Sequence, residues 1–191
     1  MNNNKNFNIV ITGVGGQGII TLISIINEAA LVEGYDLKSS ELHGLSQRGG
    51  AVEAYIRFGK KVASPLFSFK KADLVLSLEM TEALRAIVFK NPETIFAVNE
   101  NFIFFDKSIS KDYVSESLNN SIGKNIYWVR ASDICKKELN NEVVSSMYIL
   151  GFCVKKGIIK LKAESVRKAI ENIIPSKYLE MNKRAFELAL L

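Results

Sequence analysis

Apolar stretches separated by polar and glycine-rich segments divide the chain into alternating strand-like and helix-like pieces. The run FNIVIT (7–12) is short and rich in β-branched residues, which is typical of a buried strand. Residues 19–34 are a longer apolar segment ending at Gly34, and this length favours a helix packed between layers with glycine at its C-terminus. Residues 35–42 predict a second strand. This order predicts a βαβ unit with parallel neighbouring strands and a right-handed crossover.

The segment AVEAYIRFG (51–59) alternates apolar and polar side chains, which predicts a half-exposed strand. One face carries Val52, Ala54, Ile56 and Phe58, and the other carries Glu53, Tyr55 and Arg57. GKK (59–61) then predicts a turn into VASPLF, where Pro65 ends the strand pairing or marks a sheet edge. This part of the chain therefore predicts an antiparallel hairpin inserted beside a parallel sheet.

The rest of the chain predicts more buried strands followed by a mainly helical region. The strands are predicted at 72–79, 94–99 and 125–131. The helices are predicted at 80–91, 111–122, 132–140, 142–155, 163–173 and 176–189, with Ser132 and Ser176 as N-caps. One domain over residues 1–191 is expected. Its class is α/β: three layers, a mostly parallel sheet with an antiparallel hairpin insertion, and a helical C-terminal region.

Composition narrows the classes of function. A chain of 191 residues can bury one α/β core, and no apolar run approaches the ~18 residues that cross a bilayer. The N-terminus lacks the layout of a signal peptide, so a cytoplasmic location and no membrane partner are expected. The net charge of +5 comes from lysines scattered mostly in pairs, which favours solvated surface over a nucleic-acid interface.

The few metal-ligating side chains argue against a metal centre in this chain. Cys135 and Cys153 match no zinc or cluster spacing, and the sequence holds a single histidine. Both cysteines are expected to lie on helices as small apolar side chains. No bound metal is expected.

Four glycines separate the first predicted strand from the first predicted helix, in ITGVGGQGII. Gly13, Gly15 and Gly18 satisfy G-x-G-x-x-G, and Gly15 with Gly16 allows close approach to the backbone. Glu41 lies at about the spacing of the acid that binds ribose in a dinucleotide site. These residues leave three interpretations open: a nicotinamide or flavin nucleotide, another anion or acyl-carrier ligand, or packing alone.

A second glycine-rich loop, SELHGLSQRGG (40–50), follows the second predicted strand. Arg48 has a planar five-donor fork that suits phosphate or carboxylate. The alternative is that Arg48 pairs with a surface acid while the glycines only shape a turn. Both glycine-rich loops are expected to line one crevice at the carboxyl ends of the strands. The candidate residues here are His43, for which the sequence assigns no carboxylate partner, and Ser46, Gln47, Arg48, Gly49 and Gly50.

Several motifs in a fixed order carry a resemblance. GVGGQGI, SELHGLSQRGGAVEAYIRFG, SPL and ADLVLSLEMTEALR together resemble the gamma-type subunit of 2-oxoacid:ferredoxin oxidoreductases. HGLSQRGG is most similar to the small (beta) subunit of the indolepyruvate branch. The similarity is strong over residues 8–90, and MYILGF and NKRAFELAL are similar to the family's C-terminal helices.

The resemblance implies an enzyme subunit that is inactive alone. Complexes of this family oxidatively decarboxylate a 2-oxoacid on thiamine diphosphate, pass electrons through iron–sulfur clusters to ferredoxin, and release an acyl-CoA. In the indolepyruvate branch the substrates are aryl 2-oxoacids. The resemblance implies that a large alpha subunit carries the thiamine diphosphate, Mg²⁺ and clusters, and that CoA is a co-substrate.

The resemblance also leads to a hypothesis about the two loops. Gly13, Gly15, Gly16, Gln17 and Gly18 would offer backbone amides near the route of CoA. Arg48 would face a phosphate, a carboxylate or an acidic partner surface. Two other functions stay open: an NAD(P)-binding Rossmann-type protein, suggested by the glycine turn and Glu41, and a docking or regulatory module. An isolated subunit is expected to show no turnover and can form a homodimer through its exposed docking face.

Overall fold

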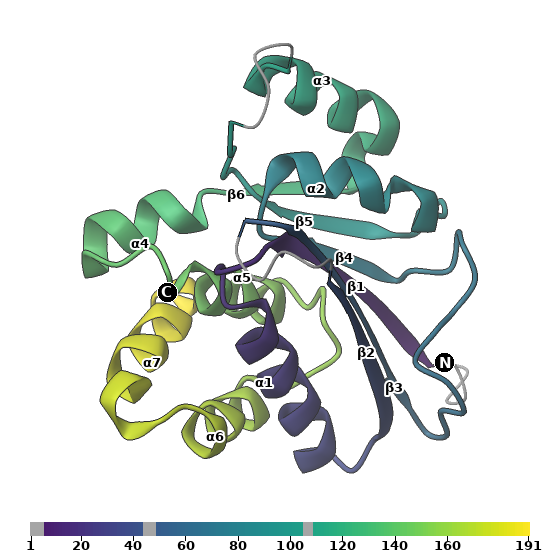
Figure 1. Ribbon diagram of the computed structural model, residues 1–191. Helices are drawn as coiled ribbons and strands as arrows, with labels where there is room; N and C mark the ends of the chain where they lie inside the picture. The colour runs from purple at the N-terminus through teal and green to yellow at the C-terminus, as the bar shows by residue number, and fades with distance from the viewer. Residues whose placement is uncertain (1–5, 44–48, 105–108) are drawn as a thin grey trace.

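The computed structural model describes residues 6–43, 49–104 and 109–191, and these residues form an α/β fold in three layers (Figure 1). Its sheet has the strand order β2-β3-β1-β4-β5-β6. The strands are β1 (Phe7–Val14), β2 (Asp36–His43), β3 (Ala51–Gly59), β4 (Leu74–Ser77), β5 (Ile95–Asn99) and β6 (Ile126–Val129). The pairs β1–β4, β4–β5 and β5–β6 are parallel, whereas β3 is antiparallel to both β1 and β2.

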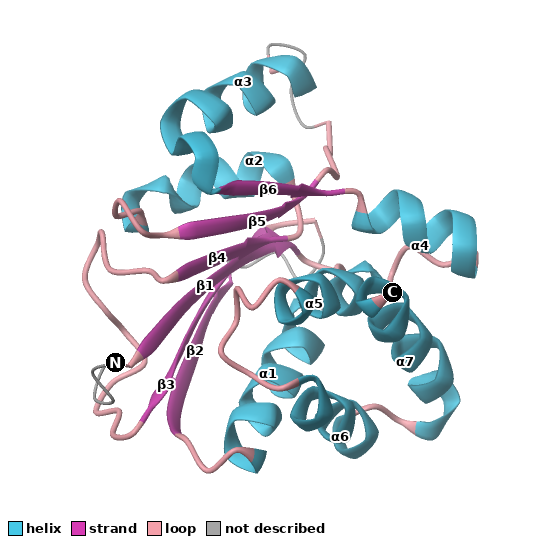
Figure 2. Cartoon of the chain, turned by 180° about the vertical axis from the view of Figure 1, so that it is seen from behind, coloured by secondary structure: helices cyan, strands magenta, loops and turns pink. Residues whose placement is uncertain are grey.

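Helices cover the two faces of the sheet (Figure 2). One face carries α1 (Ile19–Val32), α5 (Ser145–Lys155), α6 (Ala163–Ile173) and α7 (Ser176–Leu190). The other carries α2 (Met80–Arg85), which continues as the 3-10 turn η1 (Ala86–Phe89), and α3 (Lys111–Ile122), which is followed by η2 (Gly123–Asn125). Helix α4 (Ala131–Leu139) follows β6. The α/β class and the helical C-terminal region predicted from the sequence are confirmed.

Two apolar cores hold these layers together, one on each face of the sheet. Ile9 and Ile11 of β1 belong to the larger core, with α1, α5, α6 and α7, whereas Val10 belongs to the smaller core under α2 and α3. Every residue of β1 is buried. A strand buried on both faces has a continuous apolar sequence, which is why FNIVIT stands out in the chain.

The neighbours of β1 and β2 differ from the sequence prediction. Strand β3 lies between them: Ile56 pairs with Ile9 of β1 and with Ser39 of β2. Strand β2 therefore runs in the same direction as β1, but the two are not neighbours. The predicted parallel βαβ pair is wrong in this respect, because the sequence pattern shows that a strand exists and not which strand it pairs with.

The partner and the exposure of β3 also differ from the prediction. The segment after Gly59 forms no strand with β3, because the hairpin partner of β3 is the preceding strand β2. Phe67 instead packs edge-on against Tyr55, with ring centroids 5.7 Å apart, and Tyr55 is buried. The second face of β3 is therefore largely covered.

Most helix boundaries follow the periodicity, but two predicted N-caps are wrong. Helices α3 and α6 have the predicted bounds. The N-caps of α4 and α7 are Arg130 and Pro175, so Ser132 and Ser176 lie inside the first turns. Gly34 does end α1 as predicted: it has φ 77°, and its N–H donates to the Leu31 carbonyl at 2.9 Å.

Cys135 on α4 and Cys153 on α5 are buried free thiols, as predicted. Burial raises the pKa of Cys135 to about 11 and that of Cys153 to about 12. Both thiols are therefore protonated at neutral pH and act as apolar packing groups. Of the helices in the described ranges, none is long and apolar enough to cross a membrane.

Candidate functional site

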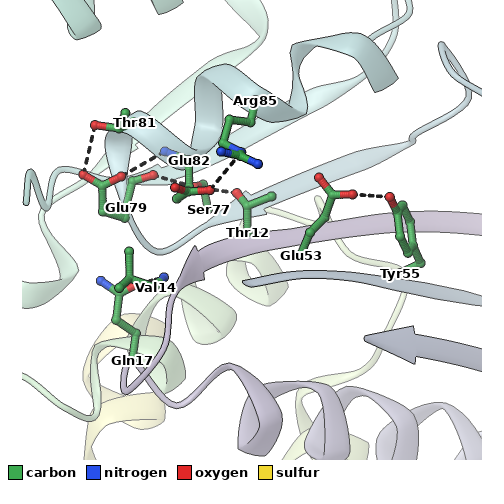
Figure 3. A network of polar contacts seen from close by, with 10 residues as sticks. All are labelled: Thr12, Val14, Gln17, Glu53, Tyr55, Ser77, Glu79, Thr81, Glu82 and Arg85. Carbon is green, nitrogen blue, oxygen red and sulfur yellow. Dashed lines mark hydrogen bonds and ion pairs between the residues drawn. The ribbon is translucent and has the colours of Figure 1, made fainter. Parts of the chain in front are cut away.

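The glycine turn between β1 and α1 is braced from inside by the side chain of Gln17 (Figure 3). The backbone N–H of Val14 donates to Gln17 Oε1 at 2.8 Å, and Gln17 Nε2 donates to the Leu78 carbonyl at 3.3 Å. A Cβ at Gly13 would lie 2.6 Å from Gln17 Oε1, so only glycine leaves room for this brace. Gln17 and Gly13 thus shape the turn.

The other glycines of the turn differ in whether their backbone groups make hydrogen bonds. Gly16 and Gly18 have φ 106° and 77°, a region that favours glycine. The N–H of Gly15 donates to the Gly50 carbonyl at 2.9 Å, and the Gly15 carbonyl accepts from Gly49 at 3.3 Å. Within the described part of the chain, Gly16 makes no hydrogen bond. Gly16 therefore offers the more available backbone amide of the turn, while Gly15 joins the two glycine-rich loops.

The sequence prediction that the two loops share one crevice is consistent with these two hydrogen bonds. Gly49 has φ 74° and is exposed, and Gly50 stands beside Gly15. His43 ends β2. Ser46, Gln47 and Arg48 lie outside the described residues. Because β2 and β1 run in the same direction, the described ends of both loops meet at the carboxyl edge of the sheet.

This edge is also a topological switch point. The parallel neighbours β1 and β4 lead into helices on opposite faces of the sheet, α1 and α2 (Figure 2). Open α/β sheets bind ligands where neighbouring strands lead to opposite faces in this way. A cavity of about 250 Å³ lies here, with polar and apolar surface in similar amounts. It is lined by Gly16, Gln17, Asn101, Ile103, Ser132, Glu142, Val143 and Ser145.

A buried polar network at the end of β4 escaped the sequence reasoning (Figure 3). Thr12 donates to Ser77 at 2.8 Å, and Ser77 donates to the Glu79 carbonyl at 2.6 Å. The fully buried Glu79 carboxylate accepts from the backbone N–H of Glu82 at 2.9 Å and of Ile103 at 3.0 Å. Glu79 thereby caps α2 and fixes the chain after β5. An acid three residues before Glu82 was the signal that could have revealed this cap.

Two more acids stand close to this network. Burial raises the pKa of the Glu82 carboxyl, the Arg85 guanidinium opposes this, and the Glu79 and Glu53 carboxylates add to it. The hydroxyl of Tyr55 donates to Glu53, and burial followed by this bond raises the pKa of Tyr55. Within the described residues no group of three or more His, Cys, Asp or Glu side chains is placed to hold a metal ion.

Glu41 is not placed as a ribose-binding acid would be. It lies on β2, pairs with Ala54 of β3 and is exposed. A dinucleotide site requires this acid on the strand next to β1. Here β3 occupies that position, so Glu41 is displaced by one further strand, or about 5 Å. The NAD(P)-binding alternative is not favoured.

Solved structures share this architecture over its full extent. Pyruvate oxidoreductase subunit PORC from Thermotoga maritima has a TM-score of 0.72 at 24% identity, covering 98% of this chain and 96% of that one. The gamma subunit of a keto/oxoacid ferredoxin oxidoreductase from Geobacter sulfurreducens has a TM-score of 0.69 at 20% identity, with 96% of both chains covered. This chain therefore shares its fold with those two subunits.

Sequence comparisons identify the family. The model of the family described as pyruvate ferredoxin/flavodoxin oxidoreductase matches residues 8–191. The indolepyruvate oxidoreductase subunit IorB of Thermococcus kodakarensis is 35% identical over 192 residues, covering 96% of this chain and 94% of the relative. The common gamma subunit of the pyruvate/ketoisovalerate oxidoreductases of Pyrococcus furiosus is 27% identical over 173 residues. The chain belongs to the pyruvate ferredoxin/flavodoxin oxidoreductase family, which confirms the resemblance found in the sequence.

Proposed function

We propose that this chain is the small subunit of an indolepyruvate-type 2-oxoacid:ferredoxin oxidoreductase. The observation that supports this most is the similarity to IorB subunits, which are 32–35% identical over at least 95% of this chain. Gamma and PorC subunits named for pyruvate are 25–27% identical. The chain spans at least 92% of the length of those IorB subunits.

The proposed reaction is that of the complex. A 2-oxoacid, CoA and two oxidised ferredoxins give an acyl-CoA, CO₂, two reduced ferredoxins and a proton. In this proposal a large partner subunit carries the thiamine diphosphate, Mg²⁺ and iron–sulfur clusters, and it supplies the decarboxylating and electron-transferring groups. The partner of this chain is that large subunit, and contact with ferredoxin is made through the complex.

The role proposed for this chain is to close the crevice through which CoA reaches the large subunit. The Gly16 amide, which has no hydrogen-bond partner among the described residues, lies beside the start of α1, where the helix dipole favours an anion. Gly49 and Gly50 are held against Gly15 at the same place. A phosphate of CoA fits the positive end of a helix and free backbone amides.

Reconstitution tests this assignment. The chain is co-expressed with a candidate large subunit from the same genome, and CoA-dependent reduction of ferredoxin is measured with indolepyruvate, 4-hydroxyphenylpyruvate, pyruvate and 2-oxoglutarate. We expect kcat/KM for the aryl 2-oxoacids to exceed that for pyruvate by about tenfold or more. A pocket shaped for an aryl group stabilises the transition state of an aryl substrate by a few kcal/mol more than that of pyruvate. Each subunit alone should be inactive. A preference for pyruvate, or full activity of the large subunit alone, would contradict the proposal.

Arg48 is the residue of the second loop whose charge this role requires. In the complex, Arg48→Ala should raise KM for CoA or weaken subunit assembly by about tenfold, because a guanidinium hydrogen bond to a charged group contributes about 1.5–3 kcal/mol. Arg48→Lys keeps the charge and serves as the matched variant. Its rise in KM for CoA, or its loss of assembly, should be smaller than that of Arg48→Ala. If Arg48→Ala left KM for CoA, turnover and assembly unaltered, the loop would have no such role.

A further inference from the structure

A second and larger cavity, of about 650 Å³, lies next to the smaller one, with Val143 in the lining of both. It lies between the start of α1, the segment before α5 and the junction of α6 with α7. Its walls are mainly apolar, and the described residues that line it include no charged side chain. Much of the apolar lining is accessible to solvent, namely Ile20, Val143, Ile173 and Tyr178. This size and lining are typical of a site for a small organic molecule.

One buried polar group marks the end of this cavity. Ser146 lines it and is 3% exposed. Its hydroxyl makes no hydrogen bond to the described part of the chain. Ser146 Oγ lies 3.2 Å from the point that a Cβ on Gly18 would occupy, so the absence of a side chain at Gly18 keeps the space beside this hydroxyl open. A charged acceptor on a ligand would gain a hydrogen bond from this hydroxyl, which contributes about 1.5–3 kcal/mol.

Three helices begin at the lining of this cavity. Gly18 is the N-cap of α1, and Ser146 lies in the first turn of α5. The first turn of α7 also reaches the lining, through Tyr178. Each helix start carries roughly +0.5 of an elementary charge and favours an anion. The ends of α4 and α6 come near Asn141 and Ile173 and offset part of this charge.

We propose that this cavity is a binding site for a small amphipathic carboxylate. The carboxylate lies between Gly18 and Ser146, where it accepts the Ser146 hydroxyl proton, and the apolar body, aromatic or branched aliphatic, packs against Ile20, Val143 and Tyr178. The site is formed by residues of this chain and borders the crevice proposed for CoA, with which it shares Val143. It does not depend on the reaction proposed above.

Binding to the isolated full-length chain tests the site. Phenylacetate is titrated by calorimetry, with phenylacetamide as the neutral probe of the same shape and phenethylamine as the cationic one. We expect phenylacetate to bind at least tenfold more tightly than either, because only the carboxylate gains from the helix starts and the hydroxyl. Equal affinity for the amide, or no saturable binding of phenylacetate at millimolar concentrations, overturns the proposal.

Adjacent serines provide a matched pair of variants. Ser146→Ala removes the hydroxyl from this cavity and should weaken phenylacetate binding about tenfold. Ser145→Ala removes a similarly buried hydroxyl from a residue that lines the smaller cavity instead. It should change the affinity for phenylacetate less than twofold. Circular dichroism confirms that both variants fold. If the two variants bind phenylacetate equally well, the ligand does not contact Ser146 and the proposal fails, while the reconstitution assay of the complex is unaffected by that outcome.

Discussion

The side-chain amide of Gln17 has its oxygen and its nitrogen both engaged inside the glycine turn, with Val14 and Leu78. From the sequence, Gln17 was grouped with the glycines that could approach a ligand. The structure gives its side chain a different task, since it joins the start of the turn to the end of β4. A pattern of glycines reveals where the backbone bends but not which polar side chain fills the bend.

The brace predicts an energetic coupling between Gln17 and Gly13. Gln17→Ala leaves the Val14 N–H unpaired and should lower the free energy of unfolding by about 1–2 kcal/mol. Gly13→Ala should cost more than 1 kcal/mol, because its methyl meets Gln17 Oε1. In the double variant this contact is gone, so the loss of unfolding free energy should be smaller than the sum of the losses in the two single variants. Urea unfolding of the four proteins measures this, and strict additivity would contradict the coupling.

Glu82 predicts a pH effect. Its pKa is raised in the folded chain, mainly by burial, so the folded state loses stability as the pH rises from the unfolded value of about 4.3 through the raised value. Glu82→Gln should therefore raise the urea midpoint at neutral pH, and this gain should vanish below about pH 4. The lost contact with Arg85 contributes little, since that side chain is 66% exposed.

Glu116→Gln on α3 is the control for this measurement. Glu116 is exposed, so its substitution should change stability by less than about 0.5 kcal/mol at either pH. A Glu82→Gln variant that is less stable than the parent at neutral pH would show that the carboxylate stabilises the network.

At the scale of elements, α5 and α7 approach closely at Gly151. A Cβ at this position would lie 2.6 Å from the Phe186 carbonyl and 2.9 Å from the Ala189 Cβ. Gly151→Ala gains about 1 kcal/mol of helix propensity, but the backbone of α7 cannot yield easily. We therefore expect a net loss of about 1–3 kcal/mol in the free energy of unfolding. Lys155→Ala, exposed on the same helix, should change it by less than about 0.5 kcal/mol; a more stable Gly151→Ala would refute the close contact.

Periodicity predicted the elements better than their partners. The bounds of α3 and α6 follow from apolar spacing alone, because each helix buries one stripe. The pairing of β3 with β2 does not follow, since alternation fixes which side chains share a face and leaves the neighbouring strand undetermined. The sequence predicted that the two loops lie at the same edge of the sheet. It did not predict the distance of Glu41 from β1, because that distance depends on which strand lies between them.

The buried network was missed for a different reason. Glu79 is an acid that follows an apolar strand. Its carboxylate accepts hydrogen bonds from the backbone N–H groups of Glu82 and Ile103, and only the fold brings Ile103 close to it. Ser145 and Ser146 fall in the predicted helix 142–155, and sequence cannot show that the two residues line different cavities.

At the scale of the whole molecule, the strand order predicts how the chain treats nucleotides. With β3 between β1 and β2, Glu41 does not stand beside β1, and Glu53, the acid of β3 that pairs with Thr12 of β1, accepts the Tyr55 hydroxyl. Titration with NADH or NADPH, followed by the fluorescence of Trp128, should therefore give no saturable change at micromolar concentrations. Tight saturable binding of either nucleotide would restore the dinucleotide interpretation.

The strand that separates β1 from β2 has a consequence for how such a chain can diversify. Both ladders of β3 run almost its whole length, so a slip of one residue within it would turn its apolar side chains to the wrong layer. Substitutions outside both ladders, by contrast, leave this register intact. Insertions and deletions that separate one relative from another should therefore be confined to segments outside β3.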